Sequence, residues 1–492
     1  MTFSASLQKL TNRIFSEEIS SAELFYQLTY MSATAASGLS RDRVFELAAQ
    51  APCRAAEHFA RIRELVRDLQ YDYPTACRIV GQTVREPDVR SFLLRLANAL
   101  EGGERLDVFL ANEAEVQGEH YGNQYEREIE SLKKWTEAYS SLIISEALIV
   151  IINLISTMIY DLGTTLMAVL MAVAVCMSFF GAWILSRAAP KEFMVLAAPH
   201  GSEAQILARR LLVILGPASV LAGGLAAVLG GGWALALVAS AAIMAPLGWI
   251  SLRADQAVAR KESEGGSFLR SLGGMATSSG TTLGEALTKV DRNSFPALKE
   301  HIATLTLRLA ARISPELCWT RFGRETGSRL LSDASRVFYD AVNLGGDPDE
   351  ISALCSMFTN KTALLRAKRR VVADTFSWLT VVMHAALGML LVIVLEIVYR
   401  FRAMIEASIE PGQAEQAMEA LNIPLLSFGD SKLSFLSGMT TSMVLLLAVV
   451  NAGAIIASDG GFRPKTFFYL AILLLVSAVC FFMGPRLIDG IM

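Results

Sequence analysis

Seven apolar stretches limit what this chain can fold into more than any other feature of the sequence. Each is close to the length of about 20 residues that an apolar helix needs to cross a bilayer. The stretches cover residues 139–160, 164–185, 206–229, 233–252, 376–399, 435–457 and 467–488. With 53% hydrophobic and 18% charged residues, the chain also differs from ordinary water-soluble proteins. The sequence therefore predicts a multi-pass protein of the inner or plasma membrane.

The basic residues between these stretches predict how the chain is oriented. They gather after the second and fourth stretches, at Arg187, Lys191, Arg209, Arg210, Arg253, Arg260 and Lys261. The turns at 161–163 and 230–232 contain none, and the loop 403–434 carries five acidic residues against one lysine. Since positive residues favour the cytoplasmic side, we expect the regions that precede the first and fifth stretches in the cytoplasm and the loop 403–434 outside.

Residues 1–19 contain Lys9 and Arg13 but no continuous apolar run. We therefore expect no cleaved signal peptide and an N-terminus that stays in the cytoplasm.

Two water-soluble regions precede the first and fifth apolar stretches, and both have the periodicity of helices. Apolar residues recur at spacings of three and four, as in Val44, Leu47 and Ala48, and no alternation typical of strands is present. We predict an all-α polytopic membrane protein with two cytoplasmic helical bundles. The segments are 1–19, a first bundle and stalk at 20–138, four spans at 139–252, a second bundle and stalk at 253–375, a fifth span at 376–402, an external loop at 403–434, and two further spans at 435–492.

The two bundles are copies of one unit. Equivalent landmarks are Gly38 and Gly280, Gly102-Gly103 and Gly345-Gly346, Trp135 and Trp378, Pro74 and Pro315, and Cys77 and Cys318. Their displacements lie between 241 and 243 residues, as expected for two copies separated by small insertions. Glycine after a helical run permits the left-handed residue that ends a helix, so most of these glycines are expected to punctuate helices without binding any ligand.

The stalks, which are the charged helices leading into the first and fifth apolar stretches, differ in sign. The first is rich in glutamate, at positions 113, 115, 119, 126, 128, 130 and 137, whereas the second carries Lys361, Arg366, Lys368, Arg369 and Arg370. Such runs are usually only solvated helix faces. Opposite charges on equivalent helices would also allow the two stalks to pair.

Several polar residues lie within the apolar stretches. Glu396 has Arg400 one turn later, which offers a local ion pair, whereas Glu146 and His384 have no such neighbour. Ionisable groups are costly to place in a membrane. Glu146, His384 and Glu396 are therefore candidate functional residues, and the alternatives are hydrogen bonding between spans or a part in a conformational cycle.

The sequence lacks the signatures of an enzyme or a metalloprotein. The six cysteines show no C-x-x-C spacing, the five histidines form no H-x-x-x-H pair, and no G-x-x-x-x-G-K-[ST] phosphate loop is present. We therefore expect no catalytic residue, cofactor or metal. A net charge of −3 also provides no basic field for nucleic acid.

A cytoplasmic all-α unit that ends in Gly-Gly, is duplicated, and leads directly into a span resembles the type II secretion system F family. The resemblance rests on Ser37-Gly38-Leu39 with Leu100-Glu101-Gly102-Gly103, and on Ser279-Gly280, Leu283-Gly284-Glu285-Ala286-Leu287 and Asn343-Leu344-Gly345-Gly346. It covers about residues 25–401. Members are inner-membrane platform proteins of type IV filament machines, namely type II secretion pseudopili, type IV pili, Tad pili and the archaellum. Four spans between the copies and two at the end are closest to the archaellum and Tad-like members.

This resemblance implies a cytoplasmic hexameric secretion ATPase as partner, pilin-like subunits as clients, and self-association. Arg366, Lys368, Arg369 and Arg370, together with Gly102, Gly103, Gly345 and Gly346, are candidates for the surface that meets the ATPase. The alternatives for the basic residues are an orientation signal or contact with anionic lipid headgroups. A membrane transporter or channel is the alternative function, but its spans, rather than a soluble bundle, would be expected to repeat around a central site.

Overall fold

The computed structural model describes residues 20–159, 163–192, 194–196, 200–229, 232–408 and 430–489. Within these ranges the chain forms α-helices and two short 3-10 helices, and no strand is present. The predicted external loop falls largely outside the described residues, as do 1–19. Seven of the described helices are long and apolar enough to cross a membrane, which confirms the predicted all-α multi-pass protein.

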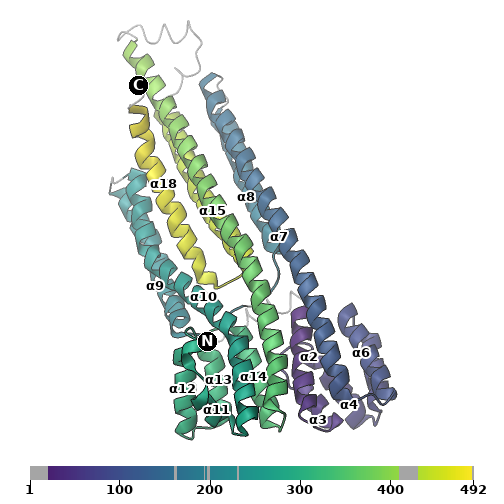
Figure 1. The fold of residues 1–492 in the computed structure, drawn as a ribbon. Coiled ribbons are helices and arrows are strands. Elements are labelled where there is room, and N and C mark those ends of the chain that lie inside the picture. The colour runs from purple at the N-terminus through teal and green to yellow at the C-terminus, as the bar shows by residue number, and fades with distance from the viewer. Residues whose placement is uncertain are drawn as a thin grey trace. The chain divides into compact units, whose positions relative to one another are not determined.

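The first copy consists of six helices, and Figure 1 labels most of them. These are α2 (Ser21–Ala36), α3 (Arg41–Ala49), α4 (Ala56–Asp68), α5 (Tyr73–Thr83), α6 (Pro87–Glu101) and α7 (Leu106–Ile159). The second copy begins within α10 (Gly232–Ser279) and continues through α11 (Leu283–Lys289), η1 (Arg292–Ser294), α12 (Lys299–Ala310), α13 (Pro315–Thr326), α14 (Arg329–Asn343) and α15 (Pro348–Ser408). The remaining elements are α8 (Gly163–Ala188), α9 (Glu203–Val228), α17 (Asp430–Asp459), η3 (Arg463–Lys465) and α18 (Thr466–Asp489).

Short polar residues and prolines define where many of these helices begin. The side chain of Ser20 accepts a hydrogen bond from the Glu23 amide, and that of Thr282 accepts one from the Glu285 amide. These contacts satisfy amides that a helix start leaves without a partner. Pro315 occupies the first position of α13, where the missing amide costs nothing.

The left-handed backbone positions show how closely the copies correspond. Gly38 and Gly280, Gln70 and Arg312, and Gly103 and Gly345 all have positive φ, and the members of each pair lie 242 residues apart. Gly103 is therefore equivalent to Gly345, one position away from the pairing that the Gly-Gly motifs suggested. Gln70 and Arg312 are the positive-φ residues other than glycine in the described part of the chain, so a turn that usually takes glycine is kept in both copies by a larger side chain.

The residues group into two compact units. The first unit contains the two bundles, up to Tyr125 and over Ala259–Leu365, and the second contains Glu126–Val258 and Arg366–Met492. The long helices α7, α10 and α15 contribute residues to both units.

In the first unit, α2 joins the two bundles. Almost all of its side chains are buried, and it packs against α14 of the second copy. The Tyr30 hydroxyl donates to the Asp340 carboxylate at 3.3 Å, and the Ser37 hydroxyl donates to the Ala341 carbonyl at 2.8 Å. Burial raises the pKa of Tyr30 to about 12 and also raises that of Asp340. The two bundles therefore share one buried interface.

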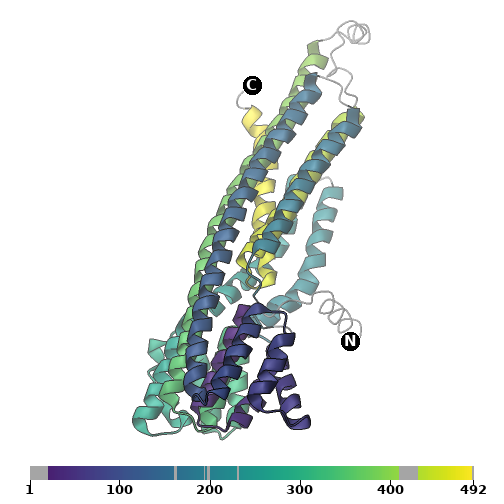
Figure 2. The same ribbon diagram turned by 90° about the vertical axis from the view of Figure 1, so that its right-hand side faces the viewer.

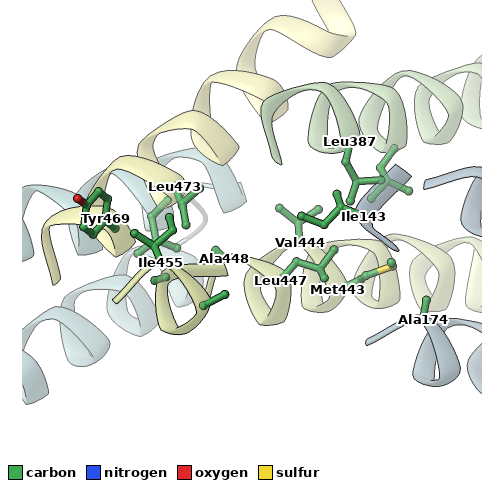
Figure 3. Close-up of a cluster of buried hydrophobic side chains, with 14 of the residues drawn as sticks. Ile143, Ala174, Leu387, Met443, Val444, Leu447, Ala448, Ile455, Tyr469 and Leu473 are labelled. Carbon is green, nitrogen blue, oxygen red and sulfur yellow. The ribbon is translucent and has the colours of Figure 1, made fainter. Parts of the chain in front are cut away.

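The second unit has its own apolar core, formed by the membrane-spanning helices. Figure 3 shows part of it, with Ile143 of α7, Ala174 of α8, Leu387 of α15, Val444 of α17 and Leu473 of α18 brought together. Helix α17 lies along α8, as the turned view in Figure 2 also shows, and packs against α18. The apolar periodicity of five separate stretches thus converges on one core.

Candidate functional site

The two stalk helices are joined by ion pairs between equivalent positions. Lys361 of α15 pairs with Glu119 of α7, and Lys368 of α15 pairs with Glu126 of α7. The partners in each pair lie 242 residues apart, which is the displacement between the copies. Gly122 leaves room for the Lys361 side chain, since a Cβ there would lie 3.0 Å from its Cε. The predicted pairing of oppositely charged stalks is confirmed.

Arg369 of the basic cluster lies inside the second unit, with 1% of its surface exposed. Its guanidinium donates to the carbonyl of Ser458 at 2.9 Å, of Ala457 at 3.3 Å and of Pro190 at 2.9 Å. Gly460, with φ of 70°, packs directly on the guanidinium, where any Cβ would clash. Arg369 therefore binds the end of α17 and the segment after α8 to α15.

A buried charge network surrounds this arginine. Lys465 of η3 donates to Asp255 of α10 at 3.2 Å and to Asp459 at the end of α17 at 3.1 Å. Arg370 lies 3.6 Å from Asp255, which also accepts a hydrogen bond from the Phe462 amide. We use the term charge network for Asp255, Arg369, Arg370, Asp459 and Lys465. Burial of such ions is tolerated because each is paired or hydrogen-bonded.

The four basic candidates do not form one exposed surface. Arg366 is also buried and donates to the Glu192 carboxylate at 3.0 Å. Lys368, by contrast, keeps 48% of its side chain exposed. Arg366 and Arg369 thus face inward, whereas Lys368 is accessible.

The four candidate glycines also differ in their exposure. Gly102, Gly103 and Gly345 are exposed, and Gly103 and Gly345 have positive φ at the turn into the stalk. Gly346 is buried, and a Cβ on it would come within 2.3 Å of Ile351 and 2.6 Å of the Ser37 hydroxyl. Gly346 therefore permits close packing between the two bundles.

Each candidate residue within the spans has a hydrogen-bond partner, either on another helix or on the same helix. The Ser178 hydroxyl of α8 donates to the Glu146 carboxylate of α7, which is buried. Glu396 accepts a hydrogen bond from Arg400 at 3.1 Å, the local ion pair that their spacing predicted. Glu146 thus links two spans, whereas Glu396 is satisfied within α15.

His384 belongs to a hydrogen-bonded chain that joins four helices. Tyr139 of α7 donates to Asn451 of α17 at 2.7 Å, and the Asn451 amide lies 3.4 Å from His384 Nδ1. His384 Nε2 lies 2.9 Å from the Ser477 hydroxyl of α18. This chain holds α7, α15, α17 and α18 together in an otherwise apolar core.

Sequence reasoning did not find Asp255, Asp459, Lys465, Tyr139 or Ser477. The signal for the first three was charge next to spans: Asp255 follows the fourth apolar stretch within α10, and Asp459 and Lys465 flank the connection between the last two spans. Tyr139 and Ser477 are compatible with an apolar helix, and their roles appear only when the spans are packed together.

Comparison with known proteins gives a consistent result. The family model described as type II secretion system (T2SS), protein F matches residues 28–154. Flagella accessory protein J of Methanococcus voltae is 25% identical over 446 residues, which cover 86% of this chain and 77% of that protein. Flagella accessory protein J of Methanocaldococcus jannaschii is 24% identical over 432 residues, covering 85% and 75%. No solved structure matches.

Proposed function

We infer from its similarity to the type II secretion system F family model and to two flagella accessory J proteins that the chain is a member of this family, on its archaeal archaellum branch. We propose that it is the membrane platform that couples a cytoplasmic secretion ATPase to the assembly of pilin-like subunits. The secretion and filament-assembly class follows from the family. The ATPase, the pilin-like clients and self-association are parts of the proposal.

The main observation in support of this proposal is that two helices run without a break from the stalks into the membrane spans. Helix α7 has 54 residues and α15 has 61, and each contains both a stalk and a membrane span without a break. A helix rises about 1.5 Å per residue and bends little compared with a loop. Movement of a stalk would therefore be passed to its span, as a platform driven by a motor requires.

The charge network supports the same role because it connects α15 with other spans. Through Arg369 and Lys465, α15 is joined to the end of α17, to η3 and to Asp255 of α10. A displacement of α15 would therefore act on α17 and, through η3, on α18. Lys368, Gly102, Gly103 and Gly345 remain candidate ATPase contacts, whereas Arg366 and Arg369 could reach a partner only if their present contacts opened.

The proposal assigns ATP hydrolysis to another chain. No phosphate loop is present in the sequence, and we expect the purified chain to be inactive on its own. The test is co-reconstitution of the chain with its secretion ATPase in liposomes. Stimulation of the ATPase by the chain is expected, and ATP hydrolysis by the chain alone, or no association between the two, would refute the proposal.

The orientation of the chain in the membrane is tested by a separate labelling experiment. We propose that both bundles are cytoplasmic, with Ser267 of α10 on the cytoplasmic side and exposed. Labelling of Ser267→Cys by a membrane-impermeant thiol reagent should therefore require broken cells, after the exposed Cys176 has been replaced by serine. Labelling in intact cells would reverse the proposed topology.

A further inference from the structure

Helices α12 and α13 of the second copy expose large apolar side chains. Leu307 of α12 is 72% exposed, Leu317 of α13 is 46% exposed, and Ile313 in the turn between them is 40% exposed. Single exposed apolar residues are common, but three gathered on one helix pair in a bundle are typical of an interaction surface.

Three exposed arginines accompany these side chains. Arg321 and Arg324 follow Leu317 at spacings of four and seven, so all three share one face of α13. Arg312 lies in the turn beside Ile313. No ion pair joins Arg312, Arg321 or Arg324 to an acidic side chain of the described residues, although Glu316 lies exposed on the same helix.

A fourth arginine, Arg308, joins the two helices through an ion pair. Arg308 of α12 binds Glu325 of α13 through two hydrogen bonds of 2.7 Å, and thereby holds the two helices together. The three exposed arginines make no comparable contact, so they are not needed to join α12 to α13.

The first copy provides an internal control. Helices α5 and α13 have the same buried positions at a displacement of 242, and Arg312 and Gln70 share the left-handed backbone. This register is one position away from the pairing of Pro74 with Pro315 and of Cys77 with Cys318 that the sequence suggested. At the positions of the three arginines the first copy has Gln70, Ile79 and Gln82, and at that of Leu317 it has Thr75. The same fold thus forms without the three arginines, whereas exposed apolar side chains occur in the first copy as well, at Leu69 and Tyr71.

We propose that this α12–α13 face, defined by Leu307, Arg312, Ile313, Leu317, Arg321 and Arg324, docks an acidic surface of the secretion ATPase, and that the equivalent face of the first copy does not. The inference rests on the proposed function and adds where the motor binds. Apolar anchors surrounded by arginines are the composition that protein interfaces favour. The unpaired positive charges select an acidic partner and accelerate its encounter.

The test measures binding of the purified secretion ATPase to the full chain in detergent at about 0.1 M salt, where charges interact over about 10 Å. The variant is Arg312→Gln, Arg321→Gln and Arg324→Gln. Gln70 shows that glutamine fits the left-handed turn, so this variant should fold as the wild type does, which its thermal unfolding would verify. The matched control is Gln70→Glu, Thr75→Glu and Gln82→Glu, which changes the charge of the first copy by the same amount.

We expect the arginine variant to weaken binding at least about tenfold, the control less than about twofold, and the difference to shrink at about 1 M salt. Leu317→Thr should weaken binding at both salt concentrations, because it removes an apolar anchor. Equal loss in both triple variants would show that the copies bind alike and would overturn the inference. Unchanged binding of the arginine variant would overturn the docking face alone, whereas a wild-type chain that does not bind the ATPase would overturn the proposed function and the docking face with it.

Discussion

The two copies share their backbone and differ in what their stalks contact. Arg127 of α7 and Arg369 of α15 occupy equivalent positions, but Arg127 is exposed whereas Arg369 is buried among three carbonyls. Gln124 and Arg366 are a second equivalent pair: Gln124 accepts a hydrogen bond from Ser21 within the first copy, whereas Arg366 is buried against Glu192. Duplication has thus kept the helices, while the stalk arginines of the second copy have become buried contacts to the segment after α8 and to the end of α17.

Among the substitutions considered, replacing the buried Arg369 should reduce the stability of the chain most. Arg369→Met removes the donor that three buried carbonyls share, so we expect a loss of about 3 kcal/mol in the free energy of unfolding. Arg127→Met, at the equivalent exposed position, should change it by less than about 0.5 kcal/mol. Thermal unfolding of both variants in detergent measures the difference. Similar values for the two would show that the copies are anchored alike.

A smaller difference in stability is expected between alanine variants of Gly346 and Gly102. Gly346→Ala forces a methyl group against Ile351 and Ser37 and should destabilise the chain by about 1–3 kcal/mol. Gly102 is exposed and has a helical φ of −73°, so Gly102→Ala should be nearly neutral. Denaturant titration of the two variants provides the comparison, and a neutral Gly346→Ala would mean that the bundle interface can readily move apart.

The ion pairs between the stalks should contribute less to stability than the packing at Gly346. Lys361→Glu places like charges opposite each other, and since Glu119 is 69% exposed we expect a cost of only about 0.5–1 kcal/mol. The exchange Lys361→Glu with Glu119→Lys should recover most of it. Melting temperatures of the single and double variants test this coupling. A double variant no more stable than the single would show that the pair does not align the stalks.

A fall in pH should lower the stability of the second bundle because of the titration of His301. Burial, and then the charge of Lys261, lower the pKa of His301 to about 4, while Glu325 and Glu300 oppose this shift and Arg308 adds to it. Because the unfolded chain binds the proton near pH 6.5 and the folded chain does not, the stability provided by neutral His301 is present above pH 6.5 and is lost as pH falls towards 4.

His301→Gln should therefore reduce the loss of melting temperature between pH 7 and pH 5. His58 lies in α4, the counterpart of α12, and burial also lowers its pKa, so His58→Gln tests whether the first bundle responds in the same way. An unchanged pH profile in His301→Gln would exclude this histidine as the cause.

The sequence predicted the architecture well because its signals are local. Apolar stretches, helix starts and the repeat need only neighbouring residues. Opposite charges on equivalent helices indicated that the stalks could pair, but not which residues would meet. The charge network was not predictable, since Asp255 and Lys465 are 210 residues apart and become partners only after four helices have packed. For the same reason the basic cluster of α15 was interpreted as one surface, although burial divides it.

The opposite signs of the stalks also make the two halves of the chain non-interchangeable. If two first copies met across the same helix pair, Glu119 would face Glu119 and Glu126 would face Glu126, and two second copies would set lysine against lysine. Repulsion of this kind is how proteins reject incorrect partners. A symmetric pair built from identical stalks is therefore disfavoured, so these charges suit a single polypeptide that carries both copies, and a half-length chain would lack the complementary helix that its stalk requires.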